Sequence, residues 1–526
     1  MISPQQARVI NNHLVLRTDT PNQYQALFPN LKVAEIKGAT YVAVPHTLES
    51  ARVFNNLGVK AESPIRSAYD WPGRFRPYPH QVHTAEFMTL NPRAFILNDM
   101  GTMKSLSALW AADYLQKIGR VKRVLVVAPL STLSPTWGNE IFQNFPFKTY
   151  AILHGSRKKR FELLAQPHDV YLINHDGLEI IASELLNRPD IGLIILDESS
   201  LYRNQRSMRW KVANAIINKS GVPRIIWGMT GAPTPNEPTD AYGQMRLIKP
   251  ENYKGHFTAF KHETMLQVSQ FKWVPKRGAE ETVNRILQPS IRYALSDCVN
   301  LPETIHTFHQ VQLSPEQHKH YRELINSAAT EIKGTMVTAV NAAVLVGKII
   351  QAALGVLYGA NGDIVKIDSS PRISVIKELI EGCRQKVIVF VPLTGALNAV
   401  ATELRKKWSV AVVDGSTSMT QRNKIFQEFR AIKDPHVLVA NAGAMSHGLT
   451  LTEASLIIWY APVTSHDTYV QANARIVRPG QKFSTQIAHV FATPEEKRIY
   501  AVLKDKGRLQ DLVLSLANGN GKKQPN

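Results

Sequence analysis

Residues 94–105 read Ala94-Phe95-Ile96-Leu97-Asn98-Asp99-Met100-Gly101-Thr102-Met103-Lys104-Ser105, a short apolar run that meets a polar loop. The apolar run predicts a buried strand, and the mostly apolar stretch 106–112 predicts a helix after the loop. Such a loop binds phosphate, because its backbone N–H groups and the start of the helix attract negative charge. In this interpretation Lys104 reaches the β and γ oxygens and Ser105 ligates Mg²⁺, while the phosphate is wrapped by Asp99, Met100, Gly101, Thr102 and Met103.

The loop departs from the phosphate-loop pattern G-x-x-x-x-G-K-[ST], since Asn98 and Met103 occupy its two glycine positions. If position 103 requires a positive φ, a methionine there costs about 1 to 3 kcal/mol of local strain, which a large domain can absorb. The loop alone therefore leaves two possibilities open, a working nucleotide site and a site that binds without hydrolysis.

The composition is that of a globular protein. The chain has 526 residues, 44% of them hydrophobic and 20% charged, which is enough for two or three domains with substantial cores. No apolar run reaches the length of a membrane span, and residues 1–20 lack the apolar block of a signal peptide, so we expect a cytoplasmic protein without a membrane partner. The only cysteines, Cys298 and Cys383, are too far apart in sequence to suggest a disulfide framework or a zinc site.

The charge favours a polyanionic partner. Lys and Arg number 62 against 42 for Asp and Glu, which gives a formal net charge of +20. A surplus spread over the whole chain suits a protein that lies along phosphates, but it does not choose DNA over RNA.

A second chemical stretch runs from Ile191 to Ser200, a predicted buried strand that ends in Asp197 and Glu198. Because buried carboxylates are costly without partners, a cation and a water explain them best. Asp197 would hold Mg²⁺ and Glu198 would orient or deprotonate the attacking water. The alternative is a turn at the strand end with solvated acids.

Two further features can be interpreted in two ways. The amide of Gln81 can donate and accept at once, which matches an adenine edge, but a glutamine here can also be a surface residue. Arg475 and Arg478 are three residues apart, so both guanidiniums can point at one anionic site, or they form a solvated basic helix end.

The order of these motifs resembles the superfamily 2 helicases, most closely the Swi/Snf type. The resemblance rests on the phosphate loop followed by Pro129-Leu130-Ser131, Asp197-Glu198-Ser199-Ser200 and Thr230-Gly231-Ala232-Pro233. It rests also on Gln471 to Gln481, which is similar to the signature Q-A-x-x-R-x-x-R-x-G-Q. The resemblance covers roughly residues 72–510.

This resemblance implies an α/β fold of two RecA-like parallel-sheet lobes in tandem, preceded by a small N-terminal α+β accessory domain. The expected domains are the accessory domain at 1–70, the ATP-binding lobe at 72–245, a helical insertion and inter-lobe connection at 246–385, the C-terminal helicase lobe at 386–515 and a disordered basic tail at 516–526.

The resemblance also implies the cofactors ATP and Mg²⁺ and the roles of the remaining motif residues. Arg475 and Arg478 would reach the γ-phosphate from the second lobe, with Arg478 as the arginine finger. Contacts to the nucleic-acid backbone are expected from Pro129, Leu130, Ser131 and Thr132 in the first lobe and from Gly448, Leu449 and Thr450 in the second. Coupling between hydrolysis and movement is expected at Thr230, Gly231 and Gln471.

The function implied is an ATP-dependent DNA translocase that acts on duplex or branched DNA in recombination, repair or fork remodelling, in a bacterial or phage-infected cell. One alternative is a strand-separating helicase on DNA or RNA. An alternative of another class is a non-catalytic nucleic-acid-binding module with a degenerate nucleotide pocket. Protein partners are left open.

Overall fold

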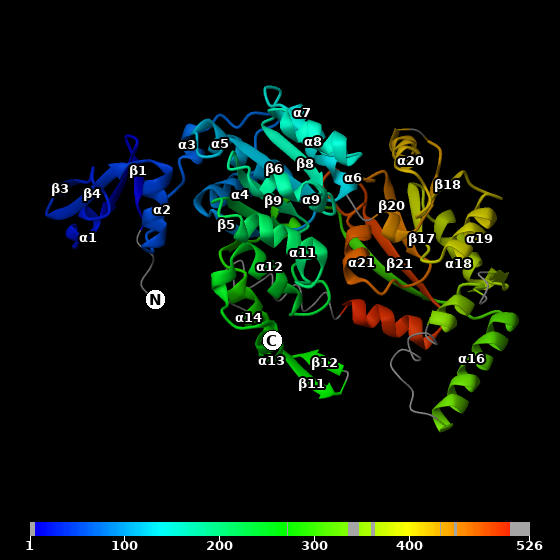
Figure 1. The fold of residues 1–526 in the computed structure, drawn as a ribbon. Coiled ribbons are helices and arrows are strands. Elements are labelled where there is room, and N and C mark those ends of the chain that lie inside the picture. The colour runs from blue at the N-terminus through cyan, green and yellow to red at the C-terminus, as the bar shows by residue number, and fades with distance from the viewer. Residues whose placement is uncertain are drawn as a thin grey trace. The chain divides into compact units, whose positions relative to one another are not determined.

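The structure is a computed structural model that describes residues 6–270, 272–334, 347–358, 363–431, 433–445 and 450–504. The chain divides into two units, and the second begins at Val299 (Figure 1). Each unit contains one large parallel sheet. Within the described ranges, no helix combines the length and apolar content needed to cross a lipid bilayer.

The first unit opens with a small antiparallel sheet. Its strands β1 (Arg8–Ile10), β2 (His13–Arg17), β4 (Ala39–Pro45) and β3 (Lys32–Ile36) lie in the order β1-β2-β4-β3. Alternate residues of β2 and β4 point inward and pack against Tyr24 and Phe28, which lie in and after α1 (Asn22–Gln25), and Phe54 of α2 (Leu48–Asn56). Helix α2 begins after Thr47, whose hydroxyl accepts from the Ser50 amide, and the chain leaves it at Gly58 with a positive φ of 78°.

A seven-stranded parallel sheet forms the rest of this unit. Its order is β13 (Ser290–Ile291), β5 (Arg93–Ile96), β10 (Ile225–Met229), β9 (Ile191–Asp197), β6 (Arg123–Ala128), β8 (Val170–Asn174) and β7 (Tyr150–Ile152). The central strands are runs of Val, Ile and Leu because both faces of the sheet are buried. The helices of this unit beyond α2 are α3 (Ile65–Ala68), α4 (Pro79–Leu90), α5 (Lys104–Lys117), α6 (Leu130–Thr132), α7 (Asn139–Asn144), α8 (Arg157–Ala165), α9 (Gly177–Ile180), α10 (Ala182–Leu186), α11 (Met208–Asn214), α12 (Asp240–Ile248), α13 (Phe257–Thr264), α14 (Ala279–Ile286) and α15 (Leu295–Cys298).

The segment between α12 and the end of this unit is less helical than the sequence suggested. After α13 the chain forms a two-stranded hairpin of β11 (Met265–Ser269) and β12 (Lys272–Pro275), and after α14 it adds β13 to the edge of the large sheet. Of the basic, aromatic segment 253–277, only α13 is therefore helical.

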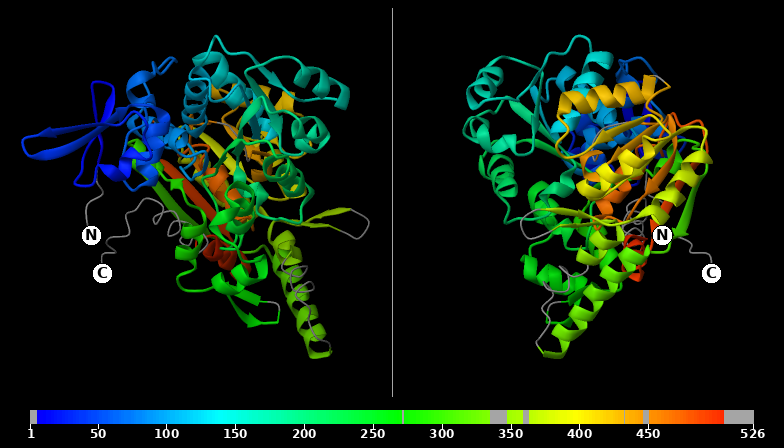
Figure 2. Two further views of the ribbon diagram at one scale, coloured as in Figure 1. Left: turned by 60° about the vertical axis from the view of Figure 1, so that its left-hand side comes forward. Right: turned by 90° about the vertical axis from the view of Figure 1, so that its right-hand side faces the viewer.

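The second unit contains a six-stranded parallel sheet. Its order is β14 (Thr304–Gln310), β21 (Thr485–Phe491), β20 (Ala454–Trp459), β17 (Lys386–Phe390), β19 (Val437–Ala440) and β18 (Val410–Val413). Two apolar clusters cover its two faces. The other elements are α16 (Pro315–Gly334), β15 (Val356–Tyr358), β16 (Ile364–Lys366), α18 (Ser370–Glu381), α19 (Thr394–Leu404), α20 (Met419–Ala431) and α21 (His466–Asn473). Figure 2 shows α16 extending away from the sheet of this unit.

Candidate active site

The phosphate loop lies where β5 delivers it, at the carboxyl edge of the seven-stranded sheet. Helix α5 begins at Lys104, directly after the loop. The Lys104 ammonium donates to the carbonyl oxygens of Asn98 at 2.8 Å and Asp99 at 3.1 Å, so it lies inside the loop. Burial lowers the pKa of Lys104, and the carboxylates of Glu198, Asp197 and Asp99 oppose that shift. The lysine and the acidic pair therefore belong to one electrostatic site.

Met103 adopts the left-handed conformation, with φ 57° and ψ 42°. Position 103 therefore has the positive φ for which the sequence analysis expects local strain. A non-glycine residue in this region costs about 1 to 2 kcal/mol. Two residues earlier, Gly101 has a φ of 87°, so the loop keeps a glycine at its other left-handed position.

A segment near the end of the unit holds the first half of the loop, through one side chain and two backbone amides. The Asp99 carboxylate forms an ion pair with Arg292 at 2.7 Å and accepts from the Leu295 amide at 2.9 Å. Asn98 accepts from the Tyr293 amide at 3.0 Å and donates to the Thr84 hydroxyl at 2.9 Å. At the glycine position of the pattern, the asparagine thus bridges the loop to two neighbouring segments.

The acidic pair lies at the end of β9, which is separated from β5 only by β10. Burial raises the pKa of Asp197, while a hydrogen bond from the Trp137 indole at 3.0 Å and the charge of Lys104 lower it. Glu198 has a φ of 54°, a left-handed conformation that redirects the chain directly after the strand. Asp197 and Glu198 are both half-buried, and the Asp197 carboxylate has a hydrogen-bond partner within the unit.

The turn after β10 packs against the phosphate loop. The Thr230 amide donates to the Ile96 carbonyl at 3.0 Å, and the Thr230 hydroxyl accepts from the Ala232 amide at 3.1 Å. A Cβ at Gly231 would lie 3.4 Å from the Met100 amide nitrogen. Thr230 is thus bonded to the strand that leads into the loop, and Gly231 lies against the loop itself.

Gln81 is buried, with 2% of its surface exposed. Its side-chain oxygen accepts from the Tyr78 amide at 2.9 Å, whereas its side-chain nitrogen has no partner in the described part of the chain. The interpretation as a surface glutamine is therefore wrong. The preceding residue, His80, donates from Nε2 to the Thr102 carbonyl at 3.1 Å, which links α4 to the loop.

The residues expected to contact nucleic acid differ in exposure. Leu130 is 40% exposed at the carboxyl end of β6, and Ser131 is half-buried. Thr132 is buried, and its hydroxyl donates to the Pro129 carbonyl at 2.9 Å within the turn. In the second unit Thr450 is half-buried, and Gly448 and Leu449 lie outside the described residues.

The two arginines lie beyond the end of α21 rather than on the helix. Arg475 is buried, and its carbonyl accepts from the Leu451 amide at 2.9 Å. Burial lowers the pKa of Arg478. Gln471 is buried on α21 and donates to the Asp467 carboxylate at 3.0 Å. Arg475 is therefore buried, whereas Arg478 is half-buried.

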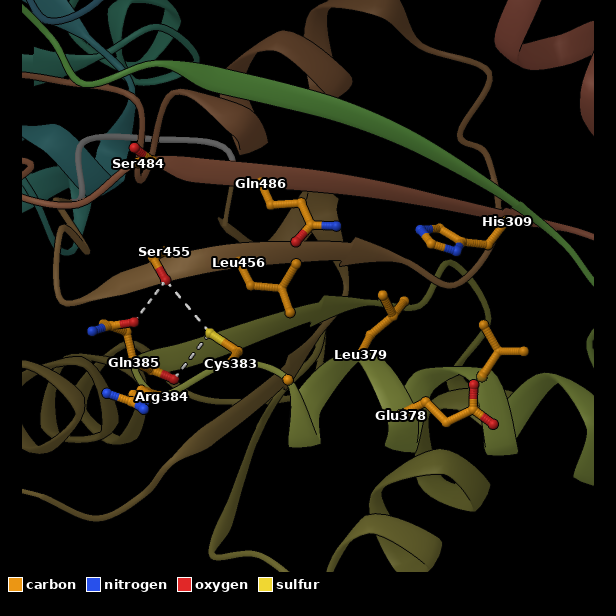
Figure 3. Close-up of a pocket in the computed structure, with 12 residues that line it drawn as sticks. His309, Glu378, Leu379, Cys383, Arg384, Gln385, Ser455, Leu456, Ser484 and Gln486 are labelled. Carbon is orange, nitrogen blue, oxygen red and sulfur yellow. Dashed lines mark hydrogen bonds between the residues drawn. The ribbon is translucent and has the colours of Figure 1, made fainter.

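A cavity of about 520 Å³ in the second unit is separate from these residues (Figure 3). It lies between α18 and the sheet, and Gln385 and Ser455 line it at the amino ends of β17 and β20. Cys383 Sγ lies 3.4 Å from the Ser455 hydroxyl, as the dashed line shows. Ligands of parallel sheets bind at the carboxyl ends of the strands, so this cavity is not where a nucleotide is expected.

Comparison with known families decides what this geometry belongs to. Residues 80–353, more than half of the chain, match the SNF2-related domain, and residues 371–480 match the helicase conserved C-terminal domain. The chain belongs to the SNF2-related family. The prediction of a Swi/Snf-type member of superfamily 2, and of an enzyme of the ATP-dependent helicase class, is thereby confirmed at the level of the family.

Individual relatives of this SNF2-related chain are distant. An uncharacterized ATP-dependent helicase of Mycoplasma genitalium is 24% identical over 79% of this chain and 39% of its own length. The SWI/SNF-related matrix-associated actin-dependent regulator of chromatin subfamily A-like protein 1 of Xenopus tropicalis is 25% identical over 76% of this chain and 41% of its own length. The chain thus spans about two fifths of the length of these two relatives.

Among solved structures, the Sulfolobus solfataricus SWI2/SNF2 ATPase core in complex with dsDNA is 20% identical, with a TM-score of 0.39. The match covers 85% of this chain and 95% of that one. The prediction of two parallel-sheet lobes behind a small antiparallel sheet is confirmed by the two sheets themselves.

Sequence reasoning missed two residues of this SNF2-related site. Arg292 lies 193 positions after Asp99, its ion-pair partner, and no local pattern links them. Trp137 stands in a π-helical turn, Leu133–Gly138, where an isolated tryptophan looks like a core residue. Only the fold brings its indole N–H to Asp197.

Proposed function

We propose that this SNF2-related chain is an ATP-driven motor that moves along duplex or branched DNA. One observation carries the proposal: the half-buried side chains of Lys104, Asp197 and Glu198 form a single electrostatic site beside the phosphate loop. Burying an ammonium and carboxylates is costly, and a module that only binds nucleic acid gains nothing from that cost. A site that hydrolyses ATP uses all three.

The residues of the first unit fit ATP with Mg²⁺. The unpartnered amide nitrogen of Gln81 is a donor suited to an acceptor on the adenine edge. The loop amides and Lys104 suit the phosphates. Ser105 and Asp197 offer the oxygen ligands that Mg²⁺ prefers, and a cation would relieve the burial that raises the Asp197 pKa. When bound, the ion would neutralise charge on the β and γ phosphates.

For hydrolysis we assign the water-orienting role to Glu198, which directly follows the metal-binding carboxylate. Arg475 and Arg478 would supply positive charge to the γ-phosphate from the second unit. An arginine finger is worth about 10³ to 10⁵ in rate, so hydrolysis would depend on the second unit taking part. Hydrolysis would then be coupled to movement between the units, through Thr230, Gly231 and Gln471.

DNA is the proposed track, gripped through its phosphate backbone. The net charge of +20 supports a polyanionic track, and the Xenopus relative is named as a regulator of chromatin. Contacts would come from Pro129 to Thr132 and from Gly448 to Thr450. Such a grip is independent of sequence and weakens with salt, because phosphate contacts release counterions. Recombination, repair or fork remodelling are the settings in which branched DNA requires such a motor.

The test is ATP hydrolysis by the purified chain without nucleic acid and with duplex DNA, single-stranded DNA or RNA. We expect duplex DNA to stimulate hydrolysis by about tenfold or more, with the stimulation lost in Lys104→Ala and kept in the matched control Lys122→Ala, an exposed lysine of the same unit. Stimulation by RNA alone would contradict the DNA assignment. Binding of DNA without any hydrolysis would favour the non-catalytic module.

A further inference from the structure

The small N-terminal sheet has one face that is open among the described residues. Register pairs Arg8 with Val15, Val15 with Ala43 and Ala43 with Lys32, so these four side chains form one row on the same face. The next row along contains Arg17, Tyr41 and Ala34. We call this the outer face, because the alternate residues Leu14, Leu16, Val42 and Val44 pack against the helices on the other side (Figure 1).

Charge is distributed unevenly between the outer face and the rest of the domain. Its strand positions include Arg8, Arg17, Lys32 and His13, and none of them is an aspartate or glutamate. The four acidic residues among positions 6–68 lie elsewhere: Asp19 follows β2, Glu35 pairs with Thr40 on the inner side, Glu49 is in α2, and Glu62 precedes α3. All charged strand positions of the outer face are therefore basic, and they stand beside apolar residues that include the exposed Ile10 and Ile36.

These cations are available to a partner. Within the described ranges, no hydrogen bond or ion pair holds the side chains of Arg8, Arg17 or Lys32, all three of which are exposed. Removing them breaks no internal contact. Several side chains on the outer face of β3 and β4 project little from the sheet, because they are the alanines Ala34, Ala39 and Ala43. A flat surface with small side chains lets a backbone approach closely.

The spacing suits a nucleic-acid groove. Three inter-strand steps separate Arg8 from Lys32, which places the ends of the row about 14 Å apart. The major groove of a DNA duplex is about 12 Å wide. The two ends of the row can thus meet phosphates on opposite sides of one groove. A second copy of this chain is a poor occupant, because two such faces would bring like charges together.

We propose that the outer face docks on the phosphate backbone of duplex DNA and forms a second grip outside the motor site. The proposal rests on the proposed function, since the DNA would be the duplex on which the motor moves. The accessory domain would anchor the chain during the part of the cycle in which the motor contacts are weak.

The experiment measures the affinity of the full chain for a labelled duplex without nucleotide, as a function of salt. The variants are Arg8→Gln, Arg17→Gln, Lys32→Gln and the triple variant. The matched control is Lys60→Gln, an exposed lysine of the same domain that is not on the outer face. At about 0.15 M salt each lost phosphate contact costs about fivefold in affinity, and the triple variant about 10². The salt slope should fall by about 0.9 for each contact, while Lys60→Gln changes little.

Ala43→Glu gives an independent variant, because it places a carboxylate at the centre of the outer face and must weaken binding as well. At saturating DNA the rate of ATP hydrolysis should match that of the unaltered chain, since the motor site is untouched. Wild-type affinity in the triple variant would overturn the proposal and leave the proposed motor standing. Tight binding of anionic lipid vesicles, or a dimer that dissociates in the triple variant, would also overturn it. An unaltered chain that does not bind duplex DNA would overturn both proposals.

Discussion

Single residues explain how the phosphate loop keeps its shape without two of the expected glycines. Asn98 holds the loop through hydrogen bonds to Thr84 and Tyr293, which glycine cannot make. Met103 instead accepts the left-handed conformation at a cost in strain. At position 98, side-chain hydrogen bonds thus shape the loop where the phosphate-loop pattern has a glycine.

The strain at Met103 predicts a stabilising substitution. Met103→Gly relieves about 1 to 2 kcal/mol of left-handed strain and loses about 0.5 to 1 kcal/mol through the greater freedom of glycine in the unfolded chain. The net expectation is a free energy of unfolding equal to that of the unaltered chain or up to about 1.5 kcal/mol higher. Denaturant titration measures it. Met103→Ala is the control, because alanine keeps the strain; equal stability of the two variants would contradict the account.

Arg292 predicts a charge effect on nucleotide binding. In Arg292→Gln the Asp99 carboxylate loses its ion-pair partner beside the phosphates, so we expect the KM for ATP to rise about tenfold, which corresponds to about 1.4 kcal/mol. The double variant Asp99→Asn/Arg292→Gln removes the uncompensated charge and should recover most of the affinity. Steady-state kinetics at saturating DNA measure both. No recovery in the double variant would show that Arg292 acts through structure alone.

Residue spacing predicted part of the site and could not predict the rest. Lys104 and Ser105 stand in a short loop after one apolar strand, and Asp197 and Glu198 stand at the end of another. Both pairs can therefore be identified from the sequence alone. Arg292 and Trp137 reach the site only through the fold. The internal bond from Tyr78 to Gln81 could not be predicted either, because it depends on how α4 begins.

Among the elements, the central strands were predictable because parallel strands buried on both faces are apolar throughout. The edge strands β13 and β14 were not. β13 has only two residues, too few to show a pattern, and β14 reads Thr-Ile-His-Thr-Phe-His-Gln, which is mostly polar. Each joins an edge of its sheet, where one side needs no strand partner and polar residues are tolerated.

The pairing of β14 with β21 predicts a pH dependence. His489 of β21 donates from Nδ1 to the Thr307 carbonyl at 3.0 Å and accepts at Nε2 from the Tyr469 hydroxyl at 2.8 Å, so the ring is neutral. Burial lowers the pKa of His489 to about 4, below the ordinary value of 6.5. The unfolded chain therefore binds more protons between these values, and stability falls as the pH drops from about 6.5 to about 4.

Between pH 6.5 and pH 4 the free energy of unfolding of the second unit should fall by about 3 kcal/mol, because this is the free energy that corresponds to the pKa shift of His489. Hydrogen exchange of the β14 and β21 amides at a series of pH values measures it, after correction for intrinsic rates. His489→Gln should be less stable at neutral pH but should flatten the dependence. His318→Gln, an exposed histidine of α16, should leave it unchanged. An unchanged pH profile in His489→Gln would contradict this assignment.

At the scale of the whole molecule, the chain passes from one unit to the next directly after the partners of the phosphate loop. Arg292, Tyr293 and Leu295 bond to the loop, and the second unit begins at Val299. Any change in the loop on hydrolysis therefore acts on the segment that leads into the second unit. A motor whose units move relative to one another needs such a connection.

The most direct test of the motor is displacement of a third strand from a DNA triplex by the chain, with ATP. A motor on duplex DNA displaces the strand only with ATP, and the lag before displacement grows with the length of duplex between the entry point and the triplex. Glu198→Gln removes the carboxylate to which we assign the activation of water, so this variant should not displace the strand. ATP hydrolysis stimulated by DNA without displacement at any length would contradict the proposed translocase.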